Sequence, residues 1–534
     1  MTERPLLEET DMKSEQSPVL GRGPSDPGRL FDVAIVGMGP VGAILAGLLG
    51  RRGVDVIVLE RDLEVFPLPR AAHIDHTGLR AVQELGCLAE LLPSTIPNPG
   101  IEFLAADGDV LMRLPGDQPT WSGVPTSVYF HQPGFDRALR AAVTALPNVD
   151  VHLEAEVVDV AQQLDWVTLR AAKRGNGSPV EVNARYVVGC DGATSPVREM
   201  LDLALEDLGF HEQWLVVDLL LGEDHAGLPP QAVYVCDPAR PHVIIPMPGR
   251  RHRIEFMLLP GEEAATMQRP ERVDEVLRKL IGDQPVTVER AAVYTFHGLI
   301  AQRWRSGRIL LAGDAAHQMP PFLGQGMCSG FRDATNLAWK LHRVLEGAPE
   351  ALLDTYETER SPHVREVVKR AIDYGAIVGT IDPQAAQERD AAIRSDHRSL
   401  LFGLPPLLPG PLVLEGGGGL FGQPPVAGVP LDDAVGQRFL VLARDDTALG
   451  STAAWWKEVV GAWVTTVADL PDPDPSLVEW LDAQGADVAI LRPDRYVLGA
   501  APGSLDQFTA RVRDLLGGDA EPDQVATTSS RMSR

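Results

Sequence analysis

Residues 31–62 restrict the fold of this chain more than any other segment. They read FDVAIVGMGPVGAILAGLLGRRGVDVIVLERD, in which Gly37, Gly39 and Gly42 form a Gly-x-Gly-x-x-Gly motif between an apolar strand and a helix of small residues. A second apolar strand follows and ends at Glu60, about 20 residues further on. This order predicts a βαβ unit that binds a dinucleotide.

Each glycine of this motif is required at its position for a different physical reason. Gly37 permits the tight turn, Gly39 lets backbone N–H groups approach a pyrophosphate, and Gly42 lets the helix pack close to the strand. The N-terminus of the helix supplies positive potential for an anion. Glu60 is expected to accept hydrogen bonds from the ribose hydroxyls of adenosine, with Arg61 beside it in the cofactor site.

Two further strands end in an acidic residue next to a glycine. ARYVVGCDGATSPVRE, at 184–199, reaches Asp191 and Gly192, and GRILLAGDAAHQMPPFLGQG, at 307–326, reaches Asp314 in the same way. A carboxylate at the end of a buried strand is costly unless a polar group meets it. Because sugar or ribityl hydroxyls would do so, we expect these residues to bind a flavin dinucleotide, with Asp314 on the ribityl chain.

The loop after Asp314 is rich in proline and glycine. A proline pair ending at Pro321 stiffens it, and Gly324 and Gly326 free backbone N–H groups at the start of the next helix. With Met327 beside them, these groups are expected to frame the isoalloxazine ring of FAD and to face an electron-rich ring carbonyl.

Composition argues against several classes of partner. The 534 residues carry a formal charge of −26, whereas nucleic acids and anionic membranes require clustered Lys and Arg. No apolar run approaches the roughly 18–20 residues that a membrane span needs. Cys87, Cys190, Cys236 and Cys328 lie far apart, so the sequence predicts neither a metal site nor a dithiol centre, and it favours a cytoplasmic location.

The predicted fold class is α/β, with a Rossmann-like FAD-binding domain, an inserted antiparallel-sheet substrate domain and a small C-terminal domain. The insertion is expected at about 100–130 and 205–300, where strand patterns interrupt the βαβ pattern. In chain order the segments are a disordered lead (1–30), the FAD-binding domain with its insertion (31–402), a Pro/Gly-rich linker (403–430), a C-terminal αβ domain (431–516) and a disordered tail (517–534).

Taken in order, the three motifs resemble those of the single-component (class A) FAD-dependent aromatic hydroxylases, over roughly residues 31–375. In PRAAHIDHTGLRAVQELG, Arg70 stands in the place of a flavin-contacting arginine. In HQPGFDRALR, Gln132 stands where family members place a glutamine near the FAD phosphates and ribityl chain. The resemblance implies a fold like that of p-hydroxybenzoate hydroxylase.

Three short segments look closest to the branch that hydroxylates 3-(3-hydroxyphenyl)propionate. They read CDPARPHVII, RIEFMLLPGE and LRPDRYV. That branch carries a C-terminal thioredoxin-like domain, which residues 431–516 would form. Because no cysteine follows Cys328, this domain is expected to have a structural role or a role in assembly, without dithiol chemistry. The resemblance favours a homodimer or a larger assembly.

The resemblance implies a monooxygenase that consumes NADH or NADPH. Reduced FAD would react with O2, and the resulting C4a-hydroperoxide would transfer one oxygen atom to a phenolic aromatic ring. The expected substrate is 3-(3-hydroxyphenyl)propionate or a related phenolic acid. The alternative is a hydroxylase of the same class that tailors a polyketide or quinone, because the fold and the cofactor sites do not define the substrate.

This chemistry requires a group that removes the proton of the phenol, since the phenolate is the better nucleophile. The candidates are His73 and His76, in the segment expected beside the flavin, and Tyr234 and His242, in the inserted sheet. Arg253 either meets a substrate carboxylate or faces outward from its strand.

Overall fold

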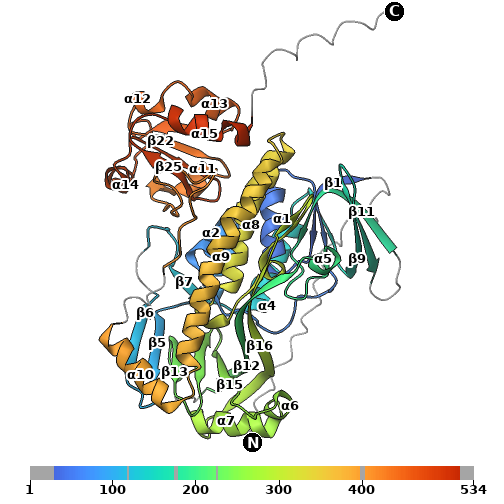
Figure 1. Ribbon diagram of the computed structural model, residues 1–534, viewed down its shortest axis with the longest axis vertical. Helices are drawn as coiled ribbons and strands as arrows, with labels where there is room; N and C mark the ends of the chain where they lie inside the picture. Colours follow the sequence, from blue (N-terminus) through green and yellow to red (C-terminus); the bar gives the residue numbers. More distant parts are fainter. Residues whose placement is uncertain (1–28, 117–119, 174–178, 224–226, 397–402, 518–534) are drawn as a thin grey trace, which may run out of the picture.

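The computed structural model describes residues 29–116, 120–173, 179–223, 227–396 and 403–517 (Figure 1). The lead and the tail that were expected to be disordered fall almost wholly outside these residues. Two large sheets and a small C-terminal domain surround two long helices, which run through the middle of the molecule (Figure 1). These helices are α8 (Gly326–Leu345) and α9 (Ala351–Val378).

The first sheet contains the predicted βαβ unit. Strand β1 (Leu30–Val36) lies between β2 (Val56–Leu59) and β11 (Pro179–Gly189) and runs parallel to both. Helix α1 (Pro40–Arg51) makes the crossover from β1 to β2. The sheet has the order β17-β18-β11-β1-β2-β8, with β9 and β10 attached to β11. Its other strands are β8 (Val149–His152), β9 (Ala155–Gln162), β10 (Val167–Lys173), β17 (Arg305–Ser306) and β18 (Ile309–Leu311).

The three sequence motifs meet at one edge of this sheet. Strands β1, β11 and β18 are parallel neighbours, and each is followed directly by one motif. Carboxyl ends of parallel strands lie at the same edge, which is where open α/β sheets bind their ligands. Gly37, Asp191 and Asp314 therefore come together although they are far apart in the chain.

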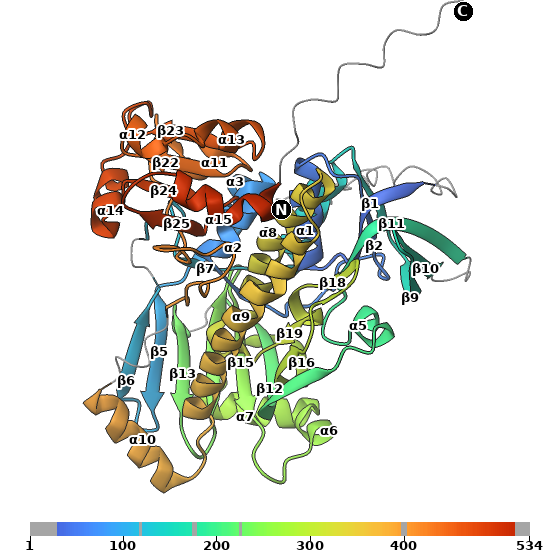
Figure 2. The same cartoon turned by 45° about the horizontal axis from the view of Figure 1, so that its top comes forward.

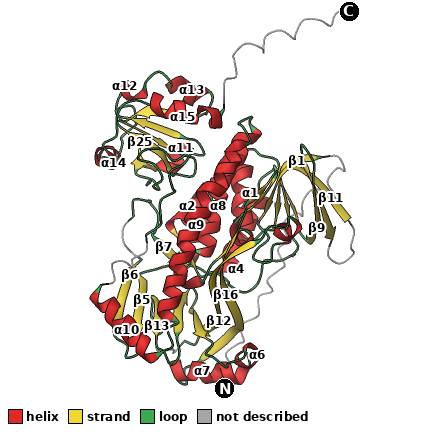
Figure 3. Cartoon of the chain, in the orientation of Figure 1, coloured by secondary structure: helices red, strands yellow, loops and turns green. Residues whose placement is uncertain are grey.

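The second sheet is built from both parts of the expected insertion. Its order is β19-β16-β12-β15-β14-β13-β5-β6. Helices α6 (Ala264–Met267) and α7 (Pro270–Ile281) cover its outer face (Figure 3). Its strands are β5 (Gly100–Ala105), β6 (Val110–Pro115), β12 (Leu205–Leu221), β13 (Ala232–Cys236), β14 (His242–Met247), β15 (Arg251–Met257), β16 (Val286–Ala301) and β19 (His317–Gln318).

Shorter elements connect the two large sheets. Strand β7 (Ser127–Tyr129) pairs with both β3 (His73–Asp75) and β4 (Ile96–Pro97). Within the described residues, no helix combines the length and the apolar character that crossing a membrane requires. The remaining helices outside the C-terminal domain are α2 (His76–Leu85), α3 (Leu88–Leu91), α4 (Gln132–Thr144), α5 (Pro196–Met200) and α10 (Pro383–Ser395).

The C-terminal domain has the strand order of a thioredoxin fold. Strand β22 (Leu440–Ala443) pairs in parallel with β23 (Trp463–Thr466) and antiparallel with β24 (Val488–Leu491), which is followed at the edge by antiparallel β25 (Val497–Ala501). Its helices are α11 (Leu431–Val435), α12 (Asp446–Leu449), α13 (Ala453–Glu458), α14 (Ser476–Gln484) and α15 (Asp506–Leu516).

The Pro/Gly-rich segment expected to be a linker packs against this domain. Leu407 and Val413 form a small buried cluster with Tyr496, and the backbone N–H of Leu414 donates to the carbonyl of Leu498. These contacts bury apolar side chains, so the described part of the segment, from residue 403, belongs structurally to the C-terminal domain.

The C-terminal domain is held to the rest of the chain by buried charges. The guanidinium of Arg492, which has no exposed surface, lies 2.8 Å from the carboxylate of Glu359 on α9. The ring of Phe439 packs edge-to-face on Trp339 of α8 at 5.3 Å. Arg80 of α2 forms a further ion pair with Asp432, at 2.7 Å. The domain therefore sits beside α2, α8 and α9, as Figure 2 shows.

Candidate active site

A cavity of about 490 Å³ lies between the carboxyl edge of the first sheet and the inner face of the second. Nine of the residues predicted to bind the cofactor line it, whereas Gly37, Gly42, Glu60, Arg61 and Asp191 do not. The nine are Gly39, Arg70, Gln132, Gly192, Asp314, Pro321, Gly324, Gly326 and Met327.

The glycines of the first motif have different surroundings. Gly37 has a φ of +98°, and a Cβ there would lie 2.6 Å from the carbonyl oxygen of Cys190. A Cβ on Gly42 would lie 2.1 Å from the carbonyl oxygen of Gly37. Gly39, in contrast, has no atom within 4 Å of its Cβ position, and it faces the cavity. Two glycines thus allow the protein to pack, while the third leaves open space for a ligand.

Glu60 holds the turn of the first motif in place. One carboxylate oxygen accepts from the backbone N–H of Met38 at 2.6 Å, and the other accepts from Asp62 at 2.8 Å. The side chain is buried outside the cavity lining. Arg61 lies next to it, about half exposed, with its guanidinium 3.5 Å from Asp62.

Asp314 has an open carboxylate inside the cavity. Among the described residues, none donates a hydrogen bond to this carboxylate. Burial raises the pKa of Asp314, an effect that the nearby charges of His317 and Arg70 oppose. Asp191 has a related deficit: Oδ2 accepts from the N–H of Val197, but no described group satisfies the buried Oδ1.

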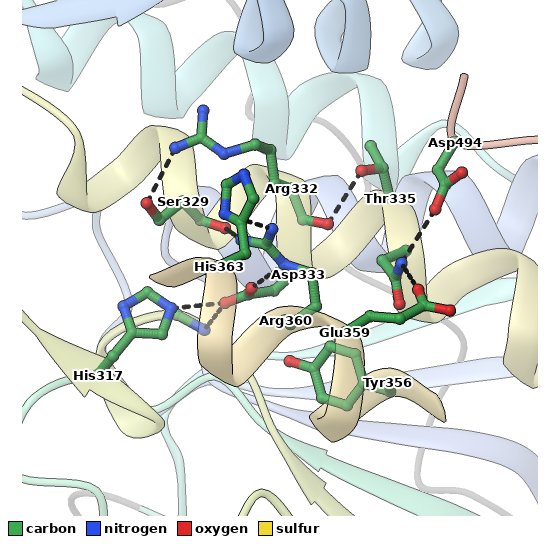
Figure 4. A network of polar contacts seen from close by, with 12 residues as sticks. His317, Ser329, Arg332, Asp333, Thr335, Tyr356, Glu359, Arg360, His363 and Asp494 are labelled. Atoms are coloured by element: carbon green, nitrogen blue, oxygen red, sulfur yellow. Dashed lines mark hydrogen bonds and ion pairs between the residues drawn. The ribbon is translucent and has the colours of Figure 1, made fainter. Parts of the chain in front are cut away.

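A buried polar network holds the turn that carries Asp314 (Figure 4). Asp333, on α8, accepts from the N–H of Gly313 at 3.1 Å and from Nε2 of His317 at 2.7 Å. Its other oxygen accepts from Nε of Arg360 on α9 at 2.8 Å. These hydrogen bonds fix the position of the turn relative to both long helices. The sequence analysis did not identify Asp333 or Arg360 as residues of the site.

Gln132 positions the segment that carries Arg70. Its amide oxygen accepts from the backbone N–H groups of Arg70 and Ala71, at 2.8 and 2.7 Å. The Gln132 oxygen is therefore occupied by the protein, while the Arg70 side chain remains exposed at the cavity.

The Pro/Gly-rich loop ends at the N-terminus of α8, which points its free N–H groups at the cavity. Gly324 has a φ of +62°, and a Cβ there would lie 2.6 Å from Nδ1 of His73. That nitrogen lies 3.3 Å from the carbonyl oxygen of Gly324, so His73 contacts this loop and also lines the cavity.

The other end of the cavity combines apolar and polar side chains. It is lined from the second sheet by side chains that include Val216, Ile245 and Phe296. Tyr234 also lines it, but its hydroxyl donates to the carbonyl of Phe322 at 2.7 Å, and burial raises its pKa well above the usual value. Tyr234 thus stays protonated and already has an acceptor.

Two of the proposed bases lie outside the cavity lining. Nδ1 of His76 lies 2.7 Å from the hydroxyl oxygen of Ser122. His242 lies on β14, an odd number of residues (three) before the cavity-facing Ile245, and its Nδ1 donates to the carbonyl of Arg240 at 2.9 Å. The pKa of each imidazole is lowered by burial. A one-residue shift along a strand turns a side chain to the opposite face, which explains the position of His242.

The second sheet carries a cluster of charged residues, Asp218, Arg253, Glu255 and Arg290, that the sequence analysis did not predict. Arg253 and Arg290 both bind the fully buried Asp218, each at 2.8 Å. Glu255 lies two residues after Arg253 on the same face of β15, and Arg253, Glu255 and Arg290 line the cavity. The alternation of Arg253 and Glu255 with apolar residues was the available sequence signal. Arg253 proves to be buried and paired within the protein.

These features fit a flavin dinucleotide. The space at Gly39 admits a group that backbone N–H donors can bind, the carboxylate of Asp314 can accept from ligand hydroxyls, and the α8 N-terminus presents positive potential. When bound, FAD supplies electron transfer and oxygen activation, and the protein supplies position and polarity.

Comparison with known proteins identifies the protein family. The chain matches the family model described as "FAD binding domain" over residues 31–371, and the one described as "HcaD C-terminal domain" over residues 418–515. It therefore belongs to the FAD-binding monooxygenase family, and its cofactor is FAD. The second match begins within the segment that was expected to be a linker, in agreement with its packing.

Similar proteins that carry a named activity indicate which reaction the protein catalyses. The chain is 39% identical to a probable NADH-specific resorcinol 4-hydroxylase of Rhodococcus jostii, over 89% of this chain and 92% of that protein. It is 34% identical to a 3-(3-hydroxy-phenyl)propionate/3-hydroxycinnamic acid hydroxylase of Mycolicibacterium smegmatis, over 89% and 91%. The protein is a flavoprotein aromatic hydroxylase, as the sequence predicted.

Solved structures confirm the fold. The monooxygenase PieE, in complex with FAD and substrate, superposes with a TM-score of 0.76 at 22% identity, covering 92% of this chain and 98% of that one. The anhydrotetracycline hydroxylase OxyS of Streptomyces rimosus gives 0.74 at 26% identity, covering 92% and 100%. The predicted α/β fold class, with its substrate-domain sheet and C-terminal domain, is confirmed.

Proposed function

We propose that this protein adds one hydroxyl group to a single-ring phenol, ortho or para to the existing hydroxyl, and consumes NADH. The observation that carries the proposal is the continuity of the cavity. It is lined at one end by Gly39, Gly192 and Asp314, and at the other by the inner face of the second sheet, where apolar side chains such as Val216 and Ile245 lie beside the charged cluster. A substrate at the second end would lie against the cofactor with water largely excluded.

The cavity size supports one ring rather than a polycycle. Its volume of about 490 Å³ includes the space near Gly324 and Gly326 that the flavin ring would fill. Ligand pockets of 300–1,000 Å³, by general experience, hold roughly one drug-sized molecule. The room left beside a flavin suits a small phenol, as the names of both curated relatives also suggest.

The charges favour an uncharged phenol such as resorcinol over a phenolic acid. Both cations of the cluster, Arg253 and Arg290, are committed to Asp218, and the carboxylate of Glu255 would repel a substrate carboxylate. 3-(3-Hydroxyphenyl)propionate remains the second candidate because the buried Nε of Arg290 has no acceptor among the described residues.

The residues proposed to hold FAD are those that line the cavity on the side of the first sheet. Gly39 would admit the pyrophosphate, Asp314 would accept from the ribityl hydroxyls, and Gly324 and Gly326 would face the ring. Glu60 and Asp191 would act beyond the cavity lining, Glu60 by holding the Gly39 turn and Asp191 through its unsatisfied oxygen.

The test is a substrate panel with the FAD-loaded protein. NADH and NADPH oxidation is followed with resorcinol, 3-(3-hydroxyphenyl)propionate and a polycyclic quinone, and the products are weighed by mass spectrometry. We expect substrate-dependent NADH oxidation and a gain of one oxygen with resorcinol. Product formation only from the polycyclic compound would contradict the proposal and favour a natural-product tailoring enzyme.

A further inference from the structure

Glu255 is a buried carboxylate at the substrate end of the cavity. The residue is only 3% exposed, yet it belongs to the cavity lining. Its cross-strand neighbours are Val216 on β12 and Val243 on β14. A charged group therefore stands between apolar side chains, at a surface that faces the substrate space.

The carboxylate of Glu255 has no protein partner among the described residues, either as an acceptor of a hydrogen bond or in an ion pair. Asp218, which is equally buried, is bound by both Arg253 and Arg290. The oxygens of Glu255 are not among the fully buried side-chain atoms that lack a partner, so they are accessible from the cavity that the residue lines. A hydrogen-bond donor on a ligand in the cavity would satisfy them.

The surroundings of Glu255 tune its affinity for a proton. Burial raises its pKa, Asp218 acts in the same direction, and the positive charges of Arg253 and Arg290 oppose the rise. Tyr234, which also faces this group, keeps its proton because burial and Glu255 both raise its pKa. A carboxylate with a raised pKa is a more effective proton acceptor near neutral pH than an ordinary one.

We propose that Glu255 accepts the proton of the phenolic hydroxyl of the substrate. This inference rests on the proposed function. In the step, the O–H bond of the phenol breaks, its electron pair remains on the phenol oxygen, and a new O–H bond forms on the carboxylate. The total charge of the site does not change, and no oxidant or further reactant takes part. Glu255 must release the proton before the next turnover.

Tyr234, His73 and His297 also line the cavity but are less suited to this step. The hydroxyl of Tyr234 already donates to the carbonyl of Phe322. His73 lies against the loop at Gly324, and burial lowers its pKa. Nδ1 of His297, on β16, lies 2.7 Å from Nδ1 of His211, and burial lowers the pKa of His297. His73 and His297 are therefore the competing bases that the experiment must distinguish from Glu255.

Proton uptake on binding tests the inference without turnover. The FAD-loaded protein is titrated with 4-nitrophenol by calorimetry, in buffers of different ionisation enthalpy, at a pH where the free probe is ionised. A carboxylate and a phenolate sharing one buried site cannot both remain charged. We therefore expect the wild type to take up about one proton, and Glu255→Gln to take up none.

The matched control is Glu289→Gln. Glu289 lies on the neighbouring part of the same sheet, paired with Arg251, and is not part of the cavity lining. This variant should take up as many protons as the wild type. Uptake that persists in Glu255→Gln, or that is absent from the wild type, would overturn the inference; persistent uptake would point to His73 or His297, which also line the cavity.

Kinetics supply the second readout. With resorcinol, Glu255→Gln should lower kcat/KM by about 100-fold or more, the usual contribution of a general base. The loss should shrink as the pH approaches the pKa of the phenol, and Glu255→Asp should recover part of it. An unchanged kcat/KM and pH profile in Glu255→Gln would reject the role. Failure of the wild type to hydroxylate any single-ring phenol would instead reject the proposed function, while the calorimetric result would stand.

Discussion

Oδ2 of Asp333 lies 2.7 Å from Nε2 of His317, and neither side chain has any exposed surface. Asp333 is on the long helix α8, and His317 is in the short strand after the turn that carries Asp314. The same carboxylate also accepts from Arg360. The position of the turn that carries Asp314 thus depends on a buried network of His317, Asp333 on α8 and Arg360 on α9 (Figure 4).

Replacing Asp333 with Asn should therefore destabilise the fold as well as the cofactor site. The change leaves Arg360 buried without its counter-ion, and breaking a buried pair in this way costs about 3–5 kcal/mol. Chemical denaturation and FAD titration measure the two effects. Glu366→Gln, in an exposed ion pair on α9, is the control and should cost less than about 1 kcal/mol. Equal stability of the two variants would contradict the role of the network.

Asp314→Asn should separate cofactor affinity from stability. Because no described residue hydrogen-bonds to this carboxylate, removing its charge should leave the unfolding free energy of the apoprotein unchanged or slightly higher. Loss of charge-assisted hydrogen bonds, worth about 1.5–3 kcal/mol, should weaken FAD binding about 10- to 150-fold. Fluorescence titration of FAD gives the affinity, and an unchanged value would refute the assignment.

Gly39→Val and Gly42→Ala form a matched pair. The new side chain at Gly39 would enter open cavity space, so the apoprotein should keep its stability while FAD binding falls by at least about tenfold. The Cβ at Gly42 would meet the Gly37 carbonyl at 2.1 Å, so this variant should unfold more easily even without FAD. Melting temperatures of both apoproteins check the contrast, which a common loss of stability would contradict.

Arg492→Met should loosen the C-terminal domain. Arg492 is buried between Glu359 and Asp494, and its removal leaves both carboxylates without this counter-ion, although Glu359 keeps its ion pair with Lys340. A cost of about 3–5 kcal/mol is expected, seen as faster limited proteolysis between the domains. Arg444→Met, which removes a more exposed pair with Asp482, should behave like the wild type. Equal cleavage rates would show that the network does not hold the domain.

The shifted pKa of Asp136, on α4, predicts that the stability of the protein depends on pH. Burial raises its pKa from 3.8 to about 6. Because the folded protein holds this proton more tightly than the unfolded chain, the contribution of Asp136 to stability is most favourable below about pH 4 and is lost as the pH rises to about 6. The full cost above that pH is about 3 kcal/mol. Asp136→Asn should remove this slope, so wild type and variant should differ most at neutral pH in urea denaturation. Parallel curves would contradict the assignment.

The local motifs were readable from the sequence because each depends on neighbours in the chain. The spacing of Gly37, Gly39 and Gly42 between two apolar strands predicts a βαβ unit, since strand, turn and helix are adjacent. The strands that precede Asp191 and Asp314 predict two more buried strands that end in a carboxylate. The family match and the fold confirm the class that these motifs indicated.

The polar partners were not readable because they come from distant elements. Asp333 and Arg360 look like ordinary helix residues until α8 and α9 pack on the Asp314 turn. The strand HRIEFM shows that Arg253 and Glu255 share a face, but not that Arg253 is neutralised by Asp218 while Glu255 is left open.

The sequence alone determined the cofactor class and the fold class, because these depend on short-range spacing and on the periodicity of apolar residues. Only the tertiary structure decided which side chains reach the cavity. His242 and Ile245 lie three residues apart on one strand, but only Ile245 faces the cavity, because the side chains of a strand alternate between the two faces of its sheet. The packing of elements that are far apart in the chain also decides which carboxylates form ion pairs. It pairs Asp218 with two arginines and leaves the carboxylate of Glu255 facing the cavity.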